Sequence, residues 1–395
     1  MSQPKPQIDY LINRRYADFR HGTGVQIKLF AGEIGQNPLH ICWDVEQNVA
    51  DTYQPVCNLN TSWLRTWPFK RGRGLVNRVE TSLGLTWHNQ SRIAKCLNQF
   101  SRSGSGKPRA YVIVASEEEA KITRQIMEVL PADYVVNVMD YLHLGETDLP
   151  ELPEFAALLK GARKVFALTP PIQDVLAQIS GRRDISILGV ARESADKPSR
   201  TLAVDTKPLE IVMMGSVDYQ RGLQELHKFC KGLDDVGVKY CLNYIGTRAM
   251  RERLGSDLPV KYCGVRLNAE RDALLGSMHL AYLPGPDGNP VEDYLARYSF
   301  PSRSTDYFWH GLPVIGPLFD DSATAQMVST LRGRGVWFSQ DPIQLVGVVK
   351  NLTQNPQAWV SASNAVYDFA QKNFSIARTA AAILDAFENE CQDRD

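Results

Sequence analysis

The chain has 395 residues, 44% of them apolar, with equal numbers of basic and acidic side chains. This length exceeds what one hydrophobic core usually supports, so we expect two globular domains. The formal net charge of zero gives no argument for a nucleic-acid partner. The first residues lack the apolar core of a signal peptide, and no apolar run is long enough to span a membrane, which predicts a cytoplasmic protein.

Cysteine and histidine show no metal-binding pattern. The seven cysteines are scattered without a CxxC pair, and the seven histidines show no spacing such as HExxH. We therefore expect no metal site and no metal cofactor, with most cysteines buried as small apolar residues.

The first half of the chain alternates short apolar runs with helical stretches. Strands are predicted over 8–16, 39–45, 110–115, 134–140, 164–168 and 185–190, and helices over 152–162 and 170–179. Continuous apolar strands that alternate with helices are typical of a parallel α/β sheet.

A polar segment over 193–208 is predicted to be a linker, and after it the same alternation restarts. Further strands are predicted over 209–215, 239–246, 260–264, 280–285, 313–316 and 335–339, with a helix over 221–236 and mostly helix over 342–391. The pattern predicts two Rossmann-like, doubly wound α/β domains that face each other across a cleft. Their expected bounds are 1–192 and 209–373.

Residues 301–315, PSRSTDYFWHGLPVI, combine helix-start residue types with a short strand. Ser302, Ser304 and Thr305 are N-cap types, Asp306 suits a first helical turn, and Gly311 is a typical helix end. A helix that starts here would offer N–H groups to an anion.

The second half resembles the nucleotide-binding domain of glycosyltransferases with the GT-B fold, specifically the family called glycosyl transferases group 1. The similar segments are IVMMGSVDYQRGLQELHKF, CLNYIGTRAMRERL, VKYCGVRLNAERDALLGSMHLAYLPG, PSRSTDYFWHGLPVI and the terminal helices. The resemblance implies that Gly215 and Arg221 face the donor diphosphate and that Val265 meets the nucleotide base. It also implies donor contacts from Arg303, Ser304, Thr305 and Asp306, and a last helix, 374–395, that crosses back to the first domain.

The carboxylate of Asp306 has two readings. It could accept hydrogen bonds from the ribose hydroxyls of the donor, or it could merely offset the dipole of its helix. Arg303 could likewise be an exposed first-turn arginine without a ligand.

The first half resembles the family more loosely. HGTGVQIKLFAGEIG (21–35) is similar to the glycine loop that faces the donor phosphates, which assigns Gly22 and Gly24 to donor binding. The family's histidine near the transferred sugar aligns with Met139, so Asp140 and His143 become the catalytic candidates. Tyr298 stands where a glutamate is common, and Ser216 replaces a common arginine.

The resemblance implies transfer of a sugar from a nucleotide-sugar donor to a glycan or lipid-linked acceptor, without a metal and with retention of configuration. Arginine and backbone N–H groups can stabilise the departing diphosphate in place of a metal. A nucleotide-sugar epimerase of the same fold and a non-catalytic nucleotide-binding or glycan-binding protein stay open as alternatives.

Residues 65–109 are locally basic, with ten Lys or Arg against the single acid Glu80. This stretch is either a solvated face or a surface for anionic lipid headgroups or an anionic acceptor.

Overall fold

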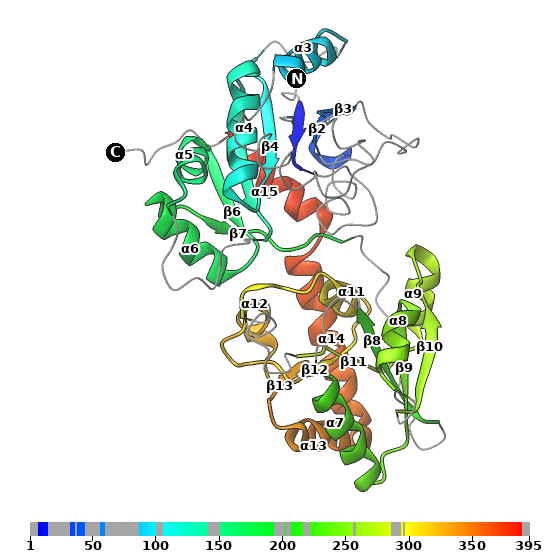
Figure 1. Ribbon diagram of the computed structural model, residues 1–395. Helices are drawn as coiled ribbons and strands as arrows, with labels where there is room; N and C mark the ends of the chain where they lie inside the picture. Colours follow the sequence, from blue (N-terminus) through cyan, green and yellow to red (C-terminus); the bar gives the residue numbers. More distant parts are fainter. Residues whose placement is uncertain are drawn as a thin grey trace, which may run out of the picture. The chain divides into compact units, whose positions relative to one another are not determined.

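The computed structural model describes residues 7–14, 32–35, 38–43, 56–59, 87–99, 106–140, 151–192, 202, 207–215, 222–255, 258–285, 294 and 297–388. The chain divides into two compact units (Figure 1). The first unit contains residues 1–191 and 376–395, and the second contains residues 192–375.

The first unit is built on a seven-stranded parallel sheet. Its strands are β1 (Tyr10–Ile12), β2 (Leu39–Cys42), β3 (Val56–Asn58), β4 (Arg109–Ile113), β5 (Asp133–Val138), β6 (Lys164–Ala167) and β7 (Ser186–Ile187). They lie in the order β3-β2-β1-β4-β5-β6-β7, so the strand order reverses between β1 and β4. The six strands predicted from the sequence are confirmed, and β3 was not predicted.

Helices pack on this sheet through apolar faces. They include α3 (Trp87–Gln99), α4 (Glu117–Val129), α5 (Pro153–Gly161), α6 (Pro170–Ser180) and the C-terminal α15 (Ile376–Glu388). Ser116 caps α4 by accepting the N–H of Glu119, whose carboxylate accepts the N–H of Ala115 in return. The ring of Phe387 in α15 lies under the Arg109 guanidinium, 5.6 Å from its centroid, which attaches the last helix to this unit.

The second unit is built on a six-stranded parallel sheet. Its strands are β8 (Leu209–Gly215), β9 (Tyr240–Gly246), β10 (Val260–Gly264), β11 (Leu280–Tyr282), β12 (Val314–Gly316) and β13 (Val336–Phe338). The order is β10-β9-β8-β11-β12-β13, which reverses between β8 and β11. All six strands agree with the pattern of the sequence, and the doubly wound α/β class is confirmed in both units.

The helices of the second unit are α7 (Leu223–Asp235), α8 (Arg248–Arg253), α9 (Asn268–Gly276), α11 (Arg303–Trp309), α12 (Ala323–Met327), α13 (Pro342–Gln354) and α14 (Pro356–Asn373), with a 3₁₀ turn, η3, over Ser329–Leu331. Helices α7 and α13 lie side by side in Figure 1 and cover one face of the sheet. Phe229 of α7 packs against Tyr282 of β11, with ring centroids 5.3 Å apart.

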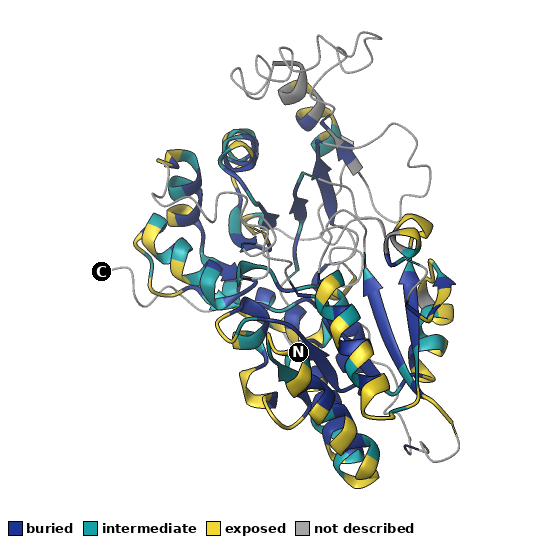
Figure 2. Cartoon of the chain, turned by 60° about the horizontal axis from the view of Figure 1, so that its bottom comes forward, coloured by how far each residue is buried: buried dark blue, intermediate teal, exposed yellow. Residues whose placement is uncertain are grey.

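Burial explains why these strands read as continuous apolar runs. In Figure 2 the strands are dark blue, whereas the helices are blue on one side and yellow on the other. Strands covered by helices on both faces need apolar side chains at successive positions, and each helix needs only one apolar stripe. In the described part of the chain, no helix is long and apolar enough to cross a membrane.

Candidate functional site

Three adjacent strands of the second sheet end in glycine at the same edge. Gly215, Gly246 and Gly264 are the last residues of β8, β9 and β10, and Gly264 has a positive φ of 74°. The carboxyl ends of parallel strands form the edge where doubly wound sheets bind ligands, next to the point where the strand order reverses. In this unit that point lies between β8 and β11.

The loops beside this edge contact one another through backbone. Gly222, the N-cap of α7, has a φ of 64°, and a Cβ atom built on it would lie 2.9 Å from the carbonyl oxygen of Gly285. A Cβ on Gly285 would in turn collide with the carbonyl oxygen of Pro317. Only glycine fits at these two positions, so the start of α7 lies against the backbone of Gly285 after β11, and Gly285 lies against Pro317 after β12.

Arg303 lies beneath the end of β8. Its guanidinium donates to the carbonyl oxygen of Met214, and a Cβ on Gly215 would overlap its Nη1 atom. Burial lowers the pKa of Arg303, and the nearby Asp306 carboxylate opposes this shift. The Met214 N–H donates to the Tyr307 hydroxyl over 2.8 Å, so α11 is bonded to β8 twice.

Asp306 sits in a buried ion-pair network. Its Oδ2 lies 3.0 Å from Nη2 of Arg192, and its Oδ1 lies 3.6 Å from Nη2 of Arg271. The Asp306 side chain is only 7% exposed. Both carboxylate oxygens therefore face arginines. A ribose hydroxyl that donates to Asp306 would have to share one of these oxygens with an arginine. No pattern in the sequence indicates either arginine, because both lie far from Asp306 along the chain.

Ser304 and Thr305 are fully buried, and their N–H groups are used within the chain. The Ser304 N–H donates to Pro301 over 2.8 Å, and the Thr305 N–H donates to Ser302 over 3.2 Å. We expected these two N–H groups to face a phosphate, and a phosphate there would have to share them with the two carbonyl oxygens. A short helix that opens with tight turns already satisfies its first N–H groups with carbonyls three residues earlier.

An exposed aromatic and aliphatic patch lies at the end of β10. Tyr262 and Val265 are 40% and 59% exposed, and Leu267 is also exposed. The Tyr262 ring stacks on Tyr244, with centroids 6.3 Å apart. Val265 was predicted to meet the nucleotide base, and Tyr262 was missed because one aromatic in a short edge strand is an ordinary pattern.

The other predicted site residues are not brought together by the described structure. Gly22, Gly24, Arg221 and His143 lie outside the described residues. Asp140 follows β5 in the first unit and is exposed. Among the described residues, the structure brings Gly215 against Arg303 of α11, whereas Val265 follows β10, which β9 separates from β8.

The basic stretch 65–109 is described only over α3 and residues 106–109. There, Lys107 pairs with Asp133 over 2.5 Å, and Arg109 lies over Phe387. These two cations are therefore engaged inside the first unit. Among the residues that the structure describes, no group of three acidic, histidine or cysteine side chains could hold a metal ion.

Comparison with solved structures identifies the fold. HepE of Anabaena, solved with UDP and glucose, superposes with a TM-score of 0.63 at 12% identity, over 97% of this chain and 100% of that one. A UDP-forming trehalose-phosphate synthase from Burkholderia xenovorans gives 0.64 at 13% identity, over 97% and 99%. Sucrose-phosphate synthase from Thermosynechococcus elongatus gives 0.61 at 13% identity, over 97% and 98%.

These neighbours are GT-B glycosyltransferases, and the chain shares their fold over nearly its whole length. The fold predicted from the sequence is confirmed. No protein-family model and no curated protein sequence matches the chain. The likeness is therefore one of structure, with little sequence identity behind it.

Proposed function

We propose that the protein is a glycosyltransferase that takes a sugar from a nucleotide-sugar donor. The observation that carries this proposal is the glycine-ended edge of the second sheet, at the point where a doubly wound sheet binds its ligand. The structural neighbours include an enzyme solved with UDP and glucose and a synthase that forms UDP. A UDP-sugar is accordingly the first donor to test.

The donor would lie along the edge formed by Gly215, Gly246 and Gly264. At Gly264 a Cβ would meet nothing within 4 Å, so backbone there can approach a diphosphate closely, whereas the same space holds the Arg303 guanidinium at Gly215 and the Tyr244 hydroxyl at Gly246. The exposed Tyr262 and Val265 would cover one face of the base. Asp306 would bind the ribose while it keeps one arginine partner, since a carboxylate can accept several hydrogen bonds.

Leaving-group stabilisation would come from Arg221 and from the glycine loop with Gly22 and Gly24. Negative charge builds on the diphosphate as it departs, and preorganised donors lower the barrier for that step. Arginine also holds a diphosphate through a planar pair of N–H groups. We therefore propose a metal-independent reaction with retention of configuration, with Asp140 and His143 as candidates on the sugar side.

The acceptor is proposed to be a glycan or a lipid-linked sugar. The basic stretch 65–109 supports an anionic acceptor or an anionic membrane surface, through the cations other than Lys107 and Arg109. The domain bounds are a separate part of the proposal. Residues 193–208 would link the two domains, and the last helix, 374–395, would pack on the first domain.

Release of nucleoside diphosphate tests the proposal. The full chain is incubated with a panel of nucleotide sugars, including UDP-glucose, with and without EDTA, and products are separated by chromatography. We expect nucleoside diphosphate and a transferred or free sugar from at least one donor, at equal rates with EDTA. An isomerised donor with no released diphosphate would indicate an epimerase, and an unchanged donor would leave only a binding protein.

A further inference from the structure

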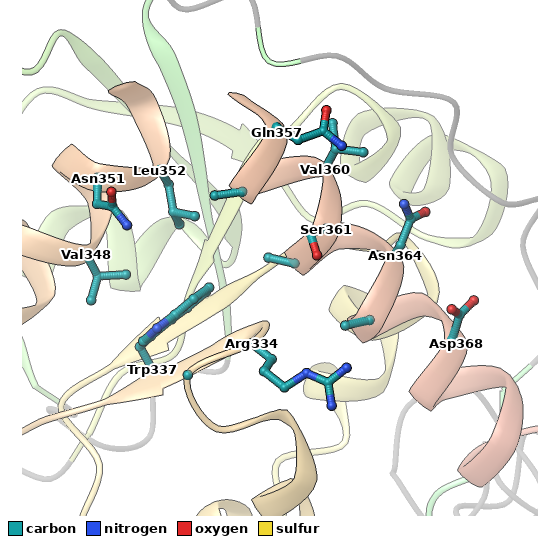
Figure 3. Close-up of a pocket in the computed structure, with 14 residues that line it drawn as sticks. Arg334, Trp337, Val348, Asn351, Leu352, Gln357, Val360, Ser361, Asn364 and Asp368 are labelled. Atoms are coloured by element: carbon teal, nitrogen blue, oxygen red, sulfur yellow. The ribbon is translucent and has the colours of Figure 1, made fainter. Parts of the chain in front are cut away.

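The second unit carries a groove that the proposed reaction does not use. It has a volume of about 590 Å³ and lies between β13, α13 and α14 (Figure 3). Gly333 and Arg334, at its rim, precede β13, and Asn351 and Leu352 come from the last turn of α13. These segments lie near the amino end of β13. The glycine-ended edge of the same sheet is at the carboxyl ends of its strands, so the two places are separate.

One face of α14 supplies a polar side of the groove. Gln357, Ser361, Asn364 and Asp368 line it, and their spacings of four, three and four residues place them on one side of a helix. Figure 3 shows them in a row along the helix, beside the shorter side chains of that face. The row offers two amides, one hydroxyl and one carboxylate in a line about 16 Å long, from the helical rise per residue.

The opposite side is formed by Trp337 and Arg334. Trp337 is only partly buried and packs against the core of the second unit. Figure 3 shows it across the groove from Ser361, with Arg334 beside it. A tryptophan at a groove wall combines a large apolar face with one N–H donor.

The charges that line the groove balance. Arg334 and Asp368 are its only charged side chains, one of each sign, and its remaining polar groups are neutral amides and hydroxyls. A phosphate or another anion would have Arg334 as its only cation among the lining residues and would lie beside the Asp368 carboxylate. An apolar ligand would leave the amides unpaired.

We infer that this groove binds a neutral oligosaccharide. Sugar rings present an apolar C–H face, which suits Trp337, and an edge of adjacent hydroxyls. That edge suits planar amides that donate and accept, a carboxylate that accepts and a guanidinium that donates. The groove volume of about 590 Å³ lies within the range of roughly 300–1,000 Å³ of small-ligand pockets. This inference depends only on the residues that line the groove and does not depend on the proposed donor site.

Titration calorimetry of the full chain with neutral hexasaccharides tests the inference. The panel contains α-1,4-glucan, β-1,4-glucan, β-1,4-N-acetylglucosamine and α-1,6-mannan chains, each with and without saturating UDP. We expect at least one to bind, with an affinity that UDP leaves unchanged. Absence of binding by every chain, or competition by UDP, would overturn the inference.

Two variants locate the binding. The double variant Gln357→Ala, Asn364→Ala removes both amides of the row, and alanine favours the helix, so the fold is retained. It should weaken oligosaccharide binding at least about tenfold, as loss of hydrogen bonds worth about 1.4 kcal/mol predicts. Trp337→Leu keeps the packed apolar contact but removes the aromatic face, and should weaken binding similarly.

The matched control is Gln354→Ala, which removes an exposed amide at the end of α13 outside the groove lining. Its affinity should equal that of the unmodified chain. Equal binding by the double variant and the control would place the oligosaccharide elsewhere and contradict the inference. Nucleoside diphosphate release should be unchanged in all three variants. This assay tests the proposed reaction, and calorimetry tests the oligosaccharide groove, so failure of one proposal can be distinguished from failure of the other.

Discussion

The carboxylate of Asp306 lies between Arg192 and Arg271. Asp306 therefore has a structural role in addition to its proposed role in ligand binding, and the two roles can be tested by different measurements. Asp306→Asn removes the charge, so that Arg192 loses its carboxylate partner and Arg271 keeps only Asp272. We expect a loss of about 3–5 kcal/mol in the free energy of unfolding of the second unit, the range for breaking a buried pair. Urea denaturation measures it. Asp272→Asn, at a carboxylate that is 44% exposed beside Arg271, is the control and should cost less than about 1 kcal/mol.

A dideoxynucleotide tests the ribose contact of the same residue. If Asp306 binds the ribose, Asp306→Asn should weaken a nucleoside diphosphate more than its 2′,3′-dideoxy analogue. Equal weakening of both nucleotides would leave Asp306 with only the structural role that its arginine partners define. The comparison is independent of the stability measurement, provided that both proteins remain folded.

Gly215 leaves room for the guanidinium of Arg303. Gly215→Ala would push that group away from the Met214 carbonyl and leave a buried donor poorly paired. We expect a loss of about 1–3 kcal/mol in stability, measured by thermal or urea unfolding. Gly276→Ala is the control, because a Cβ there meets nothing within 4 Å, and it should be neutral or slightly stabilising. Equal stabilities of the two variants would show that Arg303 moves without cost.

Sequence reasoning found α11 correctly but not the surroundings of its side chains. Hydroxyl and acidic residues before Gly311 are local signals, so the helix and its end could be predicted. Arg303 was considered as a surface arginine or a donor ligand, yet its guanidinium is bonded to Met214. Partners such as Arg192 and Met214 lie at least 89 residues away, and no periodicity encodes such contacts.

Strands β1 and β2 share a buried polar pair that makes stability depend on pH. His40 of β2 is fully buried and hydrogen-bonds through Nε2 to Asn13, which follows β1. Burial lowers the pKa of His40 to about 3, from 6.5. Between these two values the unfolded chain binds a proton that the folded chain does not bind. The His40 contribution is therefore complete above pH 6.5 and is lost as pH falls toward 3.

His40→Gln isolates this effect. Glutamine has an amide that can replace the bond to Asn13 and does not titrate in this range. Relative to the variant, the native chain should lose about 1.4 kcal/mol of stability for each pH unit below 6.5, down to about pH 3. Urea denaturation at several pH values gives the difference. Parallel stability curves for the two proteins would contradict it, whatever their absolute stabilities.

Among the elements, every strand except β3 was predicted from an apolar run. Strands β8 and β9 have seven residues each, mostly buried, and their pattern was unambiguous. Strand β3, Val-Cys-Asn, was missed because it contains only two consecutive apolar residues. Trp337 lies in another three-residue strand, β13, and the sequence does not indicate that its ring lines a groove.

For the molecule as a whole, the basic stretch 65–109 predicts electrostatic binding to anionic membranes. The full chain should sediment with anionic vesicles and not with neutral ones, and binding should weaken from about 50 to about 300 mM salt as screening shortens from roughly 14 to 6 Å. Lys70→Ser, Arg71→Ser, Arg73→Ser should reduce it. The triple variant Lys228→Ser, Lys231→Ser, Lys239→Ser removes equal charge from the second unit and should not. Salt-insensitive binding would contradict the prediction.

Diphosphate binding by the second unit is the central claim, and titration calorimetry of UDP into the full chain, in EDTA, tests it most directly. We predict one site, with Arg221→Ala weakening it by about 1.5–3 kcal/mol, or roughly 10- to 150-fold. Arg221→Lys should recover part of the loss, because charge remains while the planar fork is lost. Arg332→Ala, at an exposed arginine paired with Asp320, should change nothing. Failure of UDP and every other nucleoside diphosphate to bind, or equal affinity in the Arg221→Ala variant, would contradict the account.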